Sequence, residues 1–161
     1  MKVIKNSLQK KDFSFLNKIM TNNFFNWFIT NEIVYGDNNY QFTHNFYSDF
    51  QIKSNHFNLL DSILKIINPV SLIKIKANLL PKSNKIIEHG MHVDVINKNS
   101  KTAIYYVNTN NGYTKFENNK KITSEENKLV IFNSNIHHTG TTCTDSDYRI
   151  VINFNYFENE T

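Results

Sequence analysis

Hydrophobic residues are spaced differently in the two parts of this 161-residue chain. Within residues 15–28 and 60–67, apolar side chains recur near the three- and four-residue spacing of an amphipathic helix. Pro69 follows the second series and is expected to close that helical region. The pattern predicts that residues 1–70 form a mostly helical support region.

From Ser71 onward the pattern changes to short runs rich in Ile, Val, Tyr, Phe and Thr, which are typical of β-strands. The candidate strands are Ser71–Leu79, Met91–Val95, Thr102–Val107, Tyr113–Glu117, Lys128–Phe132 and Arg149–Phe157. The pair Asn111-Gly112 between two of them is a hairpin signal. Helices followed by short strands, with no helices between those strands, predict a mainly β fold: an antiparallel sandwich or barrel with helices on one side.

Composition and length favour one globular domain that spans residues 1–161, with its β core in residues 71–157. The hydrophobic fraction of 40% and the aromatic fraction of 14% exclude a disordered chain. Cys143 is the only cysteine, which excludes a disulfide framework and a multi-cysteine zinc site. No apolar run is long enough for a membrane span, and the N-terminus lacks a signal-peptide pattern, so we expect a cytoplasmic location without membrane association.

The basic residues are scattered singly along the chain, so the net charge of +4 is weak support for nucleic-acid binding. Seventeen of the eighteen basic residues are lysine, and the remaining one is Arg149. The chain is also rich in Asn and Ile, a bias typical of an AT-rich genome that replaces arginine codons with lysine codons. An arginine that is kept under such a bias is expected to have a role that the ammonium group of lysine cannot fill.

His92 and Asp94 lie two residues apart in a candidate strand, which would place both side chains on one face. Imidazole and carboxylate groups together suit a first-row divalent metal, and two histidines with one carboxylate leave positions open for other ligands. The third ligand would come from His137 or His138, the only histidines downstream. A bare His-x-Asp sequence also occurs by chance, so this motif alone is weak.

Arg149 begins the last candidate strand, where a charged guanidinium enters an apolar run. Its planar fork is suited to binding a carboxylate through two hydrogen bonds. An ordinary salt bridge to an acidic residue is the alternative. The His-x-Asp pair, the downstream histidine and the β-rich second half together favour a carboxylate-binding role for Arg149.

The order of these motifs resembles the 2-oxoglutarate/Fe(II)-dependent oxygenase superfamily, in particular its prolyl-hydroxylase-like branch and small phage-encoded members. The resemblance covers roughly residues 71–157 and rests on His92-Val93-Asp94, Ala103–Asn108, Leu129–Ser134, His138-Thr139-Gly140 and Arg149–Phe154. It implies a double-stranded β-helix, which is a jelly-roll or cupin-like barrel. In place of the family's frequent Gly-Gly pair in the hairpin after the tyrosine-rich strand, this chain has Asn111-Gly112.

The resemblance implies that His92, Asp94 and His138 are the catalytic metal ligands, with His137 facing away or lining the mouth. It further implies that Arg149 binds the distal carboxylate of 2-oxoglutarate and that Tyr106 hydrogen-bonds the same carboxylate. Alternation along the strand does not choose between Tyr106 and its neighbour Tyr105.

Two asparagines are further candidates for contacts with the cosubstrate. Asn153 shares a strand face with Arg149 and Val151, and Asn78 lies near the end of the first candidate strand of the β core. Ordinary capping or turn roles are the alternative for both.

The implied reaction is hydroxylation of a C–H bond with release of succinate and CO2, which needs Fe(II), 2-oxoglutarate and O2, with ascorbate as an optional reductant. By analogy, a protein side chain such as a prolyl residue ranks first as substrate, a small molecule second and a nucleobase third. A phage-encoded protein would act in the host cytoplasm, and the oligomeric state is left open. The alternatives are a metal-dependent hydrolase that uses Glu88 as its base and a non-catalytic jelly-roll binding protein.

Overall fold

The computed structural model describes residues 1–33 and 39–158, and within them the chain is mainly antiparallel β-sheet. The strands are β1 (Lys2–Ile4), β2 (Phe28–Thr30), β3 (Gln41–Ser48), β4 (Gln51–Ile52), β5 (Ser71–Pro81), β6 (Ser100–Tyr106), β7 (Tyr113–Phe116), β8 (Lys121–Thr123), β9 (Lys128–Asn133), β10 (His138–Gly140) and β11 (Tyr148–Phe157). The helices are α1 (Lys10–Met20), the short 3-10 helix η1 (Phe57–Leu60) and α2 (Asp61–Ile67).

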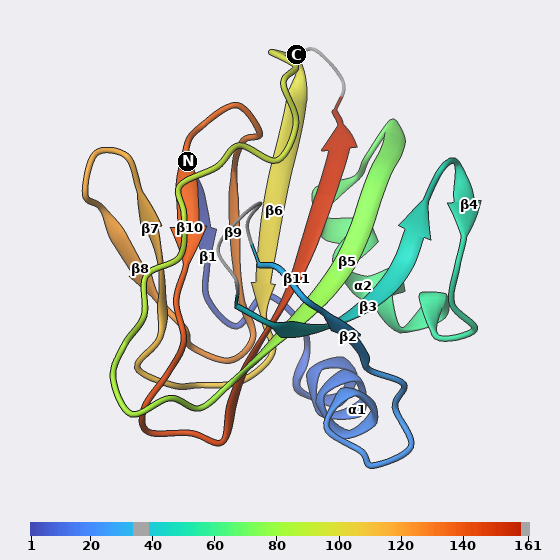
Figure 1. Ribbon diagram of the computed structural model, residues 1–161. Coiled ribbons are helices and arrows are strands. Elements are labelled where there is room, and N and C mark those ends of the chain that lie inside the picture. Colours follow the sequence, from blue (N-terminus) through green and yellow to red (C-terminus); the bar gives the residue numbers. More distant parts are fainter. Residues whose placement is uncertain (34–38, 159–161) are drawn as a thin grey trace.

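The strands of the described residues form two sheets (Figure 1). The larger sheet has the order β1-β9-β6-β11-β5-β3-β2, with β4 paired to β3, and the smaller has the order β10-β7-β8. Figure 1 shows the smaller sheet at the left, beside the larger one, with α1 below and α2 behind the larger sheet. Because β6, β11 and β5 are neighbours in the larger sheet, residues far apart in sequence are brought to one surface.

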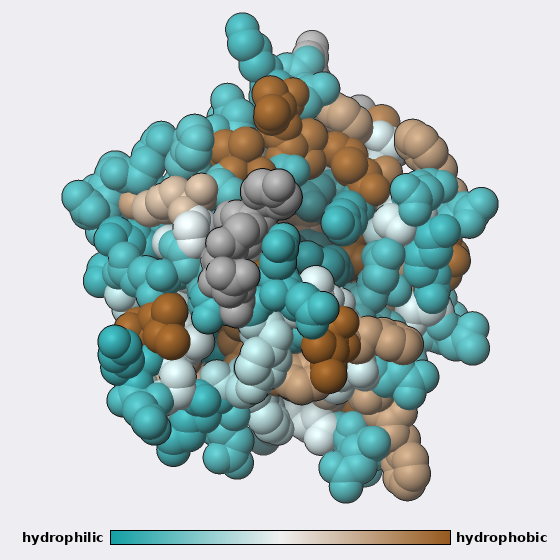
Figure 2. Space-filling view, viewed as in Figure 1, coloured by the Kyte–Doolittle hydropathy of each residue, from teal (hydrophilic) through white to brown (hydrophobic). Residues whose placement is uncertain are grey.

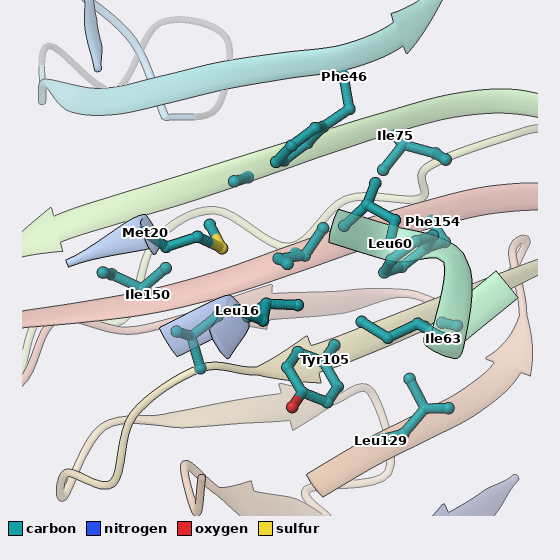
Figure 3. Close-up of a cluster of buried hydrophobic side chains, with 14 of the residues drawn as sticks. Leu16, Met20, Phe46, Leu60, Ile63, Ile75, Tyr105, Leu129, Ile150 and Phe154 are labelled. Atoms are coloured by element: carbon teal, nitrogen blue, oxygen red, sulfur yellow. The ribbon is translucent and has the colours of Figure 1, made fainter. Parts of the chain in front are cut away.

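One face of the larger sheet packs against both helices (Figure 3). Alternate residues of a strand point to opposite faces, so Ile75 of β5 and Ile152 of β11 face the helices. Leu16 from α1 and Ile63 from α2 complete this core. All four side chains are at most 1% exposed, and burial of each contributes about 1.5–3 kcal/mol to folding.

The opposite face of the larger sheet looks towards the smaller sheet and carries a second, smaller apolar cluster. In this cluster Phe116 of β7 packs with Tyr106 of β6 and Phe132 of β9. The cluster fills only part of the space between the sheets. Along β5 and β11 the same face carries mostly polar side chains, which makes this space the place to look for a binding site.

Five of the six predicted strands are confirmed with small shifts at their ends, but the prediction of a strand at Met91–Val95 is wrong. That segment makes only an isolated antiparallel bridge between His92 and His138. The residues around the bridge instead form an extended connection between β5 and β6, so simple alternation does not orient the side chains there.

The prediction of a mostly helical region over residues 1–70 also needs correction. Helices occupy Lys10–Met20 and Phe57–Ile67, but β1 to β4 lie in the same region. Phe28, included in the first helical series, begins β2 and pairs with Thr43 of β3. Pairing in a sheet thus overrides a spacing that resembled a helix. The second helix ends as predicted, with Asn68 in the left-handed conformation (φ 44°) just before the proline.

No helix among the described residues is both long and apolar enough to cross a membrane. Figure 2 shows hydrophilic side chains over most of one face of the molecule, with hydrophobic residues in separate patches.

Candidate metal and cosubstrate site

His92, Asp94 and His138 come together between the two sheets and form the candidate metal centre. Their potential ligand atoms all lie within 4.8 Å of one another. Asp94 Oδ1 is 3.6 Å from His92 Nε2 and 3.7 Å from His138 Nε2. Two imidazole nitrogens and one carboxylate oxygen therefore point to a common centre, the donor set expected for a first-row divalent metal with open positions.

Backbone pairing fixes the distance between the two histidines. The amide of His92 donates to the carbonyl of His138 at 3.0 Å, and the reciprocal bond is also 3.0 Å. In each ring Nδ1 faces a backbone carbonyl, that of Gly90 for His92 and that of Ile136 for His138. A protonated Nδ1 donating to these carbonyls leaves the lone pair of each Nε2 free for a metal.

His138 is held in the form that a metal needs. The ring is only 3% exposed, and this burial lowers its pKa, although Asp94 and the hydrogen bond to Ile136 act in the opposite direction. A neutral imidazole is therefore favoured at neutral pH, and only the neutral ring can donate its lone pair to a metal.

Two residues that sequence reasoning missed orient the carboxylate of Asp94. Its second oxygen, Oδ2, accepts hydrogen bonds from Thr102 Oγ1 at 2.9 Å and from Asn155 Nδ2 at 3.0 Å. Thr102 on β6 and Asn155 on β11 are direct partners across the sheet. Asn155 shares a strand face with Arg149 and Asn153, and this alternation was the one sequence signal that could have identified it.

Arg149 is buried at the other end of the same cavity, with 2% of its surface exposed. Its Nε donates to Ser124 Oγ at 2.8 Å and its Nη2 to Thr114 Oγ1 at 3.2 Å. No acidic side chain in the described part of the chain lies within 4.0 Å of the guanidinium. Burial lowers the pKa of Arg149, although Tyr106 and Cys143 act in the opposite direction. Without an acidic side chain nearby, the buried charge lacks a compensating anion.

Tyr106 is the tyrosine that lies beside the arginine. Its hydroxyl donates to Thr114 Oγ1 at 2.8 Å, and the Arg149 guanidinium carbon is 5.7 Å from its ring centre. Tyr105 faces the helices instead, where its hydroxyl donates to Asn127 at 3.2 Å. Of the two tyrosines, Tyr106 is therefore the one that lies on the same side of the sheet as Arg149.

Two glycines allow the backbone to approach the arginine closely. A Cβ atom on Gly112 would lie 2.7 Å from Arg149 Cδ and 2.8 Å from the carbonyl oxygen of Thr142. A Cβ atom on Gly140 would lie 3.3 Å from Arg149 Nη1. Gly112 of the Asn111-Gly112 pair is thus the glycine that this packing needs.

Asn78 and Asn153 also line the cavity, which has a volume of about 260 Å³. The Oδ1 atom of each is buried and has no hydrogen-bond partner among the described residues. Buried polar atoms without partners are costly, so both atoms are expected to meet a ligand or ordered water. The donor set and the uncompensated arginine fit a metal with a small dicarboxylate. The two amide oxygens only accept hydrogen bonds, so they need a donor such as water or a substrate N–H or O–H group.

His137 and Glu88 lie outside this site. His137 is exposed, and its Nδ1 is 3.4 Å from Glu117 Oε2. Glu88 accepts hydrogen bonds from Tyr113 Oη at 2.6 Å and Lys115 Nζ at 2.7 Å, which lower its pKa to about 2. A carboxylate with both oxygens bound and a low pKa is poorly suited to activate water, which argues against Glu88 as the base of a hydrolase.

The bonds of Glu88 to Tyr113 and Lys115 on β7 hold the segment that carries His92 against the smaller sheet. Their contribution to stability should therefore depend on pH. The carboxyl pKa of about 2 is below the value of about 4.3 for an unfolded chain, so its stabilisation is complete above about pH 4.3 and is lost as the pH falls towards 2. With the side chain 34% exposed, we expect Glu88→Gln to lower Tm by only about 2–4 °C at pH 7. Thermal unfolding of both proteins between pH 7 and pH 3 should show the difference shrinking below about pH 4; a difference that grows there contradicts this role.

Comparison with known proteins gives matches at the level of structure. No protein-family model matches the sequence. No curated protein matches it either.

Solved structures with the same fold include a 2OG-Fe(II) oxygenase, a prolyl hydroxylase and an alpha ketoglutarate dependent epimerase. An oxidoreductase of the 2OG-Fe(II) oxygenase family from Burkholderia pseudomallei matches with a TM-score of 0.71 and 11% identity, over 99% of this chain and 86% of that one. A prolyl hydroxylase from Trichoplax adhaerens, in complex with a peptide of hypoxia inducible factor, gives a TM-score of 0.67 and 14% identity, over 97% and 82%. The epimerase SnoN, in complex with Fe3+ and alpha ketoglutarate, gives a TM-score of 0.67 and 10% identity, over 97% and 78%. The chain thus has the fold of the 2-oxoglutarate/Fe(II) oxygenases, the predicted double-stranded β-helix.

Proposed function

We propose that this protein is an Fe(II)- and 2-oxoglutarate-dependent oxygenase that hydroxylates a C–H bond. His92, Asp94 and His138 would hold the iron, and Arg149 would bind the distal carboxylate of 2-oxoglutarate. In the proposed reaction one atom of O2 enters succinate and the other enters the hydroxylated product, while CO2 leaves.

The observation that carries the proposal is the pairing of a His-Asp-His centre with a buried arginine across one cavity. Arg149 is only 2% exposed, and a charge buried to this degree normally has an acidic partner. Among the described residues the guanidinium has none. A bound carboxylate would compensate this charge. The fold comparison adds support, because the SnoN structure with this fold holds Fe3+ and alpha ketoglutarate.

Iron and 2-oxoglutarate, when bound, supply the oxygen activation, and the protein supplies binding and orientation. Thr102 and Asn155 hold Asp94 Oδ2 so that Oδ1 faces the histidines. Ser124 and Thr114 hold the guanidinium of Arg149 and thereby set where a carboxylate can sit. Tyr106 would donate to that carboxylate in exchange for its present bond to Thr114. Asn78 and Asn153 line the cavity between these two ends.

The substrate is proposed to be a side chain of a peptide or a small molecule. The cavity of about 260 Å³ is smaller than the sites that usually enclose drug-sized ligands, and the cosubstrate would take part of it. A single side chain, such as a prolyl group, or a small metabolite fits this limit. The prolyl hydroxylase of the same fold, in complex with its peptide, supports the first of these classes.

The test is to add Fe(II) and 2-oxoglutarate to the purified protein without oxygen and to record the visible charge-transfer band of the chelated complex. Admission of O2 should then form succinate even without substrate, at a low rate. We expect both signals in the wild type and neither in His92→Ala. Succinate formation at the same rate in His92→Ala would refute the proposal, and a folded wild type with no band would favour a non-catalytic binding protein.

Asn155 provides a prediction for the support of the metal centre. Replacing it with alanine removes one of the two hydrogen bonds to Asp94 Oδ2, and changes of this kind typically weaken metal binding about 10- to 100-fold. The measurement is an anaerobic Fe(II) titration of the variant, with the exposed Asn58→Ala as the matched control. Unchanged affinity in Asn155→Ala would mean that Thr102 alone orients the carboxylate.

A further inference from the structure

Two lysines share the cavity wall with the candidate iron centre, and the proposed reaction gives them no role. Lys74 and Lys76 lie on β5 and, being two residues apart, point to the same side of the sheet. That side is the one that carries Asn78 and that faces the smaller sheet. Lys74 is exposed and Lys76 is half-buried.

Neither lysine has an acidic partner in the part of the chain that the structure describes. Their partners across the sheet are amides: Asn153 and Asn45 lie beside Lys76, and Asn155 lies beside Lys74. Sheets commonly compensate a charge with an opposite charge on the facing position, and that compensation is missing here.

Asp94 is the acidic side chain among the described residues that line the cavity. Burial lowers the pKa of Lys76, the charge of Lys74 lowers it further, and Asp94 acts against both. In the proposed complex, however, the carboxylate of Asp94 is a ligand of the metal. The cavity would then hold two lysines without any protein anion to face them.

The charges of the filled site balance without these lysines. Fe(II) and Arg149 carry three positive charges, and 2-oxoglutarate and Asp94 carry three negative ones. The histidines are neutral as ligands. Lys74 and Lys76 therefore leave two positive charges beside the place where a substrate must enter, and in a partly buried site such charges favour an anion.

We infer that Lys74 and Lys76 form an anion subsite and that the substrate carries a carboxylate or phosphate group close to the C–H bond that is oxidised. Between the two proposed substrate classes, this favours a small anionic molecule over an uncharged prolyl side chain. This inference rests on the proposed function, because the iron and 2-oxoglutarate define where the substrate sits. Lys76, the more buried of the two, is the main specificity-determining residue, and Lys74 attracts the anion at the entrance.

The test is NMR titration of the protein loaded with Zn(II), which cannot turn over, and with saturating 2-oxoglutarate. Sodium acetate and methyl phosphate serve as probes, each at constant ionic strength set with sodium chloride. We expect saturable shifts of the backbone amides of residues 74–78 and 153–155 in the wild type. Lys76→Met should weaken binding about five- to tenfold, as expected for one partly exposed charge-assisted hydrogen bond. Lys65→Met, the same change on α2 behind the sheet, should leave it unchanged.

The possible outcomes distinguish failure of the proposed function from failure of the anion subsite. If 2-oxoglutarate itself causes no shifts around Arg149 and Thr114, the proposed function fails, and the anion subsite with it. If 2-oxoglutarate binds but neither probe gives saturable shifts, or if the shifts are the same in Lys76→Met, the anion subsite alone is overturned. Tighter binding of acetate assigns a carboxylate substrate, and tighter binding of methyl phosphate assigns a phosphate substrate.

Discussion

Replacing Arg149 with methionine is expected to raise the 2-oxoglutarate concentration for half-maximal turnover at least about thirtyfold and to leave metal binding intact. Truncating one partner of a buried, hydrogen-bonded charge pair costs about 2–5 kcal/mol, which sets this scale. The guanidinium is 2% exposed and is held by Ser124 and Thr114, so water cannot easily replace it. Succinate formation measured against 2-oxoglutarate concentration gives the value.

Thermal unfolding separates loss of binding from loss of folding in this variant. At a 2-oxoglutarate concentration a hundredfold above Kd, the ligand should stabilise the metal-loaded wild type by about 2.7 kcal/mol, or roughly 5–10 °C for a chain of this size. Arg149→Met should unfold near the wild-type temperature without ligand, because methionine removes a buried charge that lacks an anion. It should gain no stability from 2-oxoglutarate. A full thermal shift in Arg149→Met would exclude the arginine as the carboxylate-binding residue.

Changing Asp94 to asparagine is expected to weaken Fe(II) binding more than about a hundredfold and to remove detectable turnover. Loss of a residue that only supports a ligand already costs about 10- to 100-fold, and here the ligand itself loses its charge. Asparagine would also present an N–H group either to the metal or to Asn155, whose Nδ2 now donates to Asp94 Oδ2. Anaerobic Fe(II) titration and succinate formation are the measurements.

Asp61→Asn provides the matched control, because it makes the same chemical change at an exposed position of α2. It should bind Fe(II) and form succinate as the wild type does. If Asp94→Asn retained wild-type iron affinity, the metal would have to bind through another set of ligands, and the proposed centre would be wrong.

The sequence predicted the residues of the candidate site better than it predicted how the chain holds them. His92, Asp94, His138 and Arg149 were expected to meet, and the structure places them around one cavity. The reason given for the first two was a strand over Met91–Val95, and that strand is absent from the described residues. Their positions depend instead on the backbone bridge to His138 and on hydrogen bonds to Asp94, which come from residues distant in sequence.

The supporting residues could not be predicted because their roles depend on strand order. Thr102 and Asn155 are ordinary strand residues in the sequence and become partners only when β6 pairs with β11. The same is true of β3, whose polar sequence resembles a loop until it pairs with β5 on one side and β2 on the other. Local spacing identified strands with continuous apolar runs, whereas β1, β2 and β3, at or next to the edges of the larger sheet, needed the tertiary fold.

The reciprocal backbone bonds between His92 and His138 have a consequence for metal selection. These bonds fix the separation of the two backbones, so the chain itself, rather than a metal, brings the two histidines together. A rigid His-Asp-His site of this kind also accepts Co(II), Ni(II) or Zn(II), and ions later in the Irving–Williams series would bind more tightly than Fe(II). We therefore expect the metal supply of the surrounding cell, more than the chain itself, to decide which ion occupies the centre.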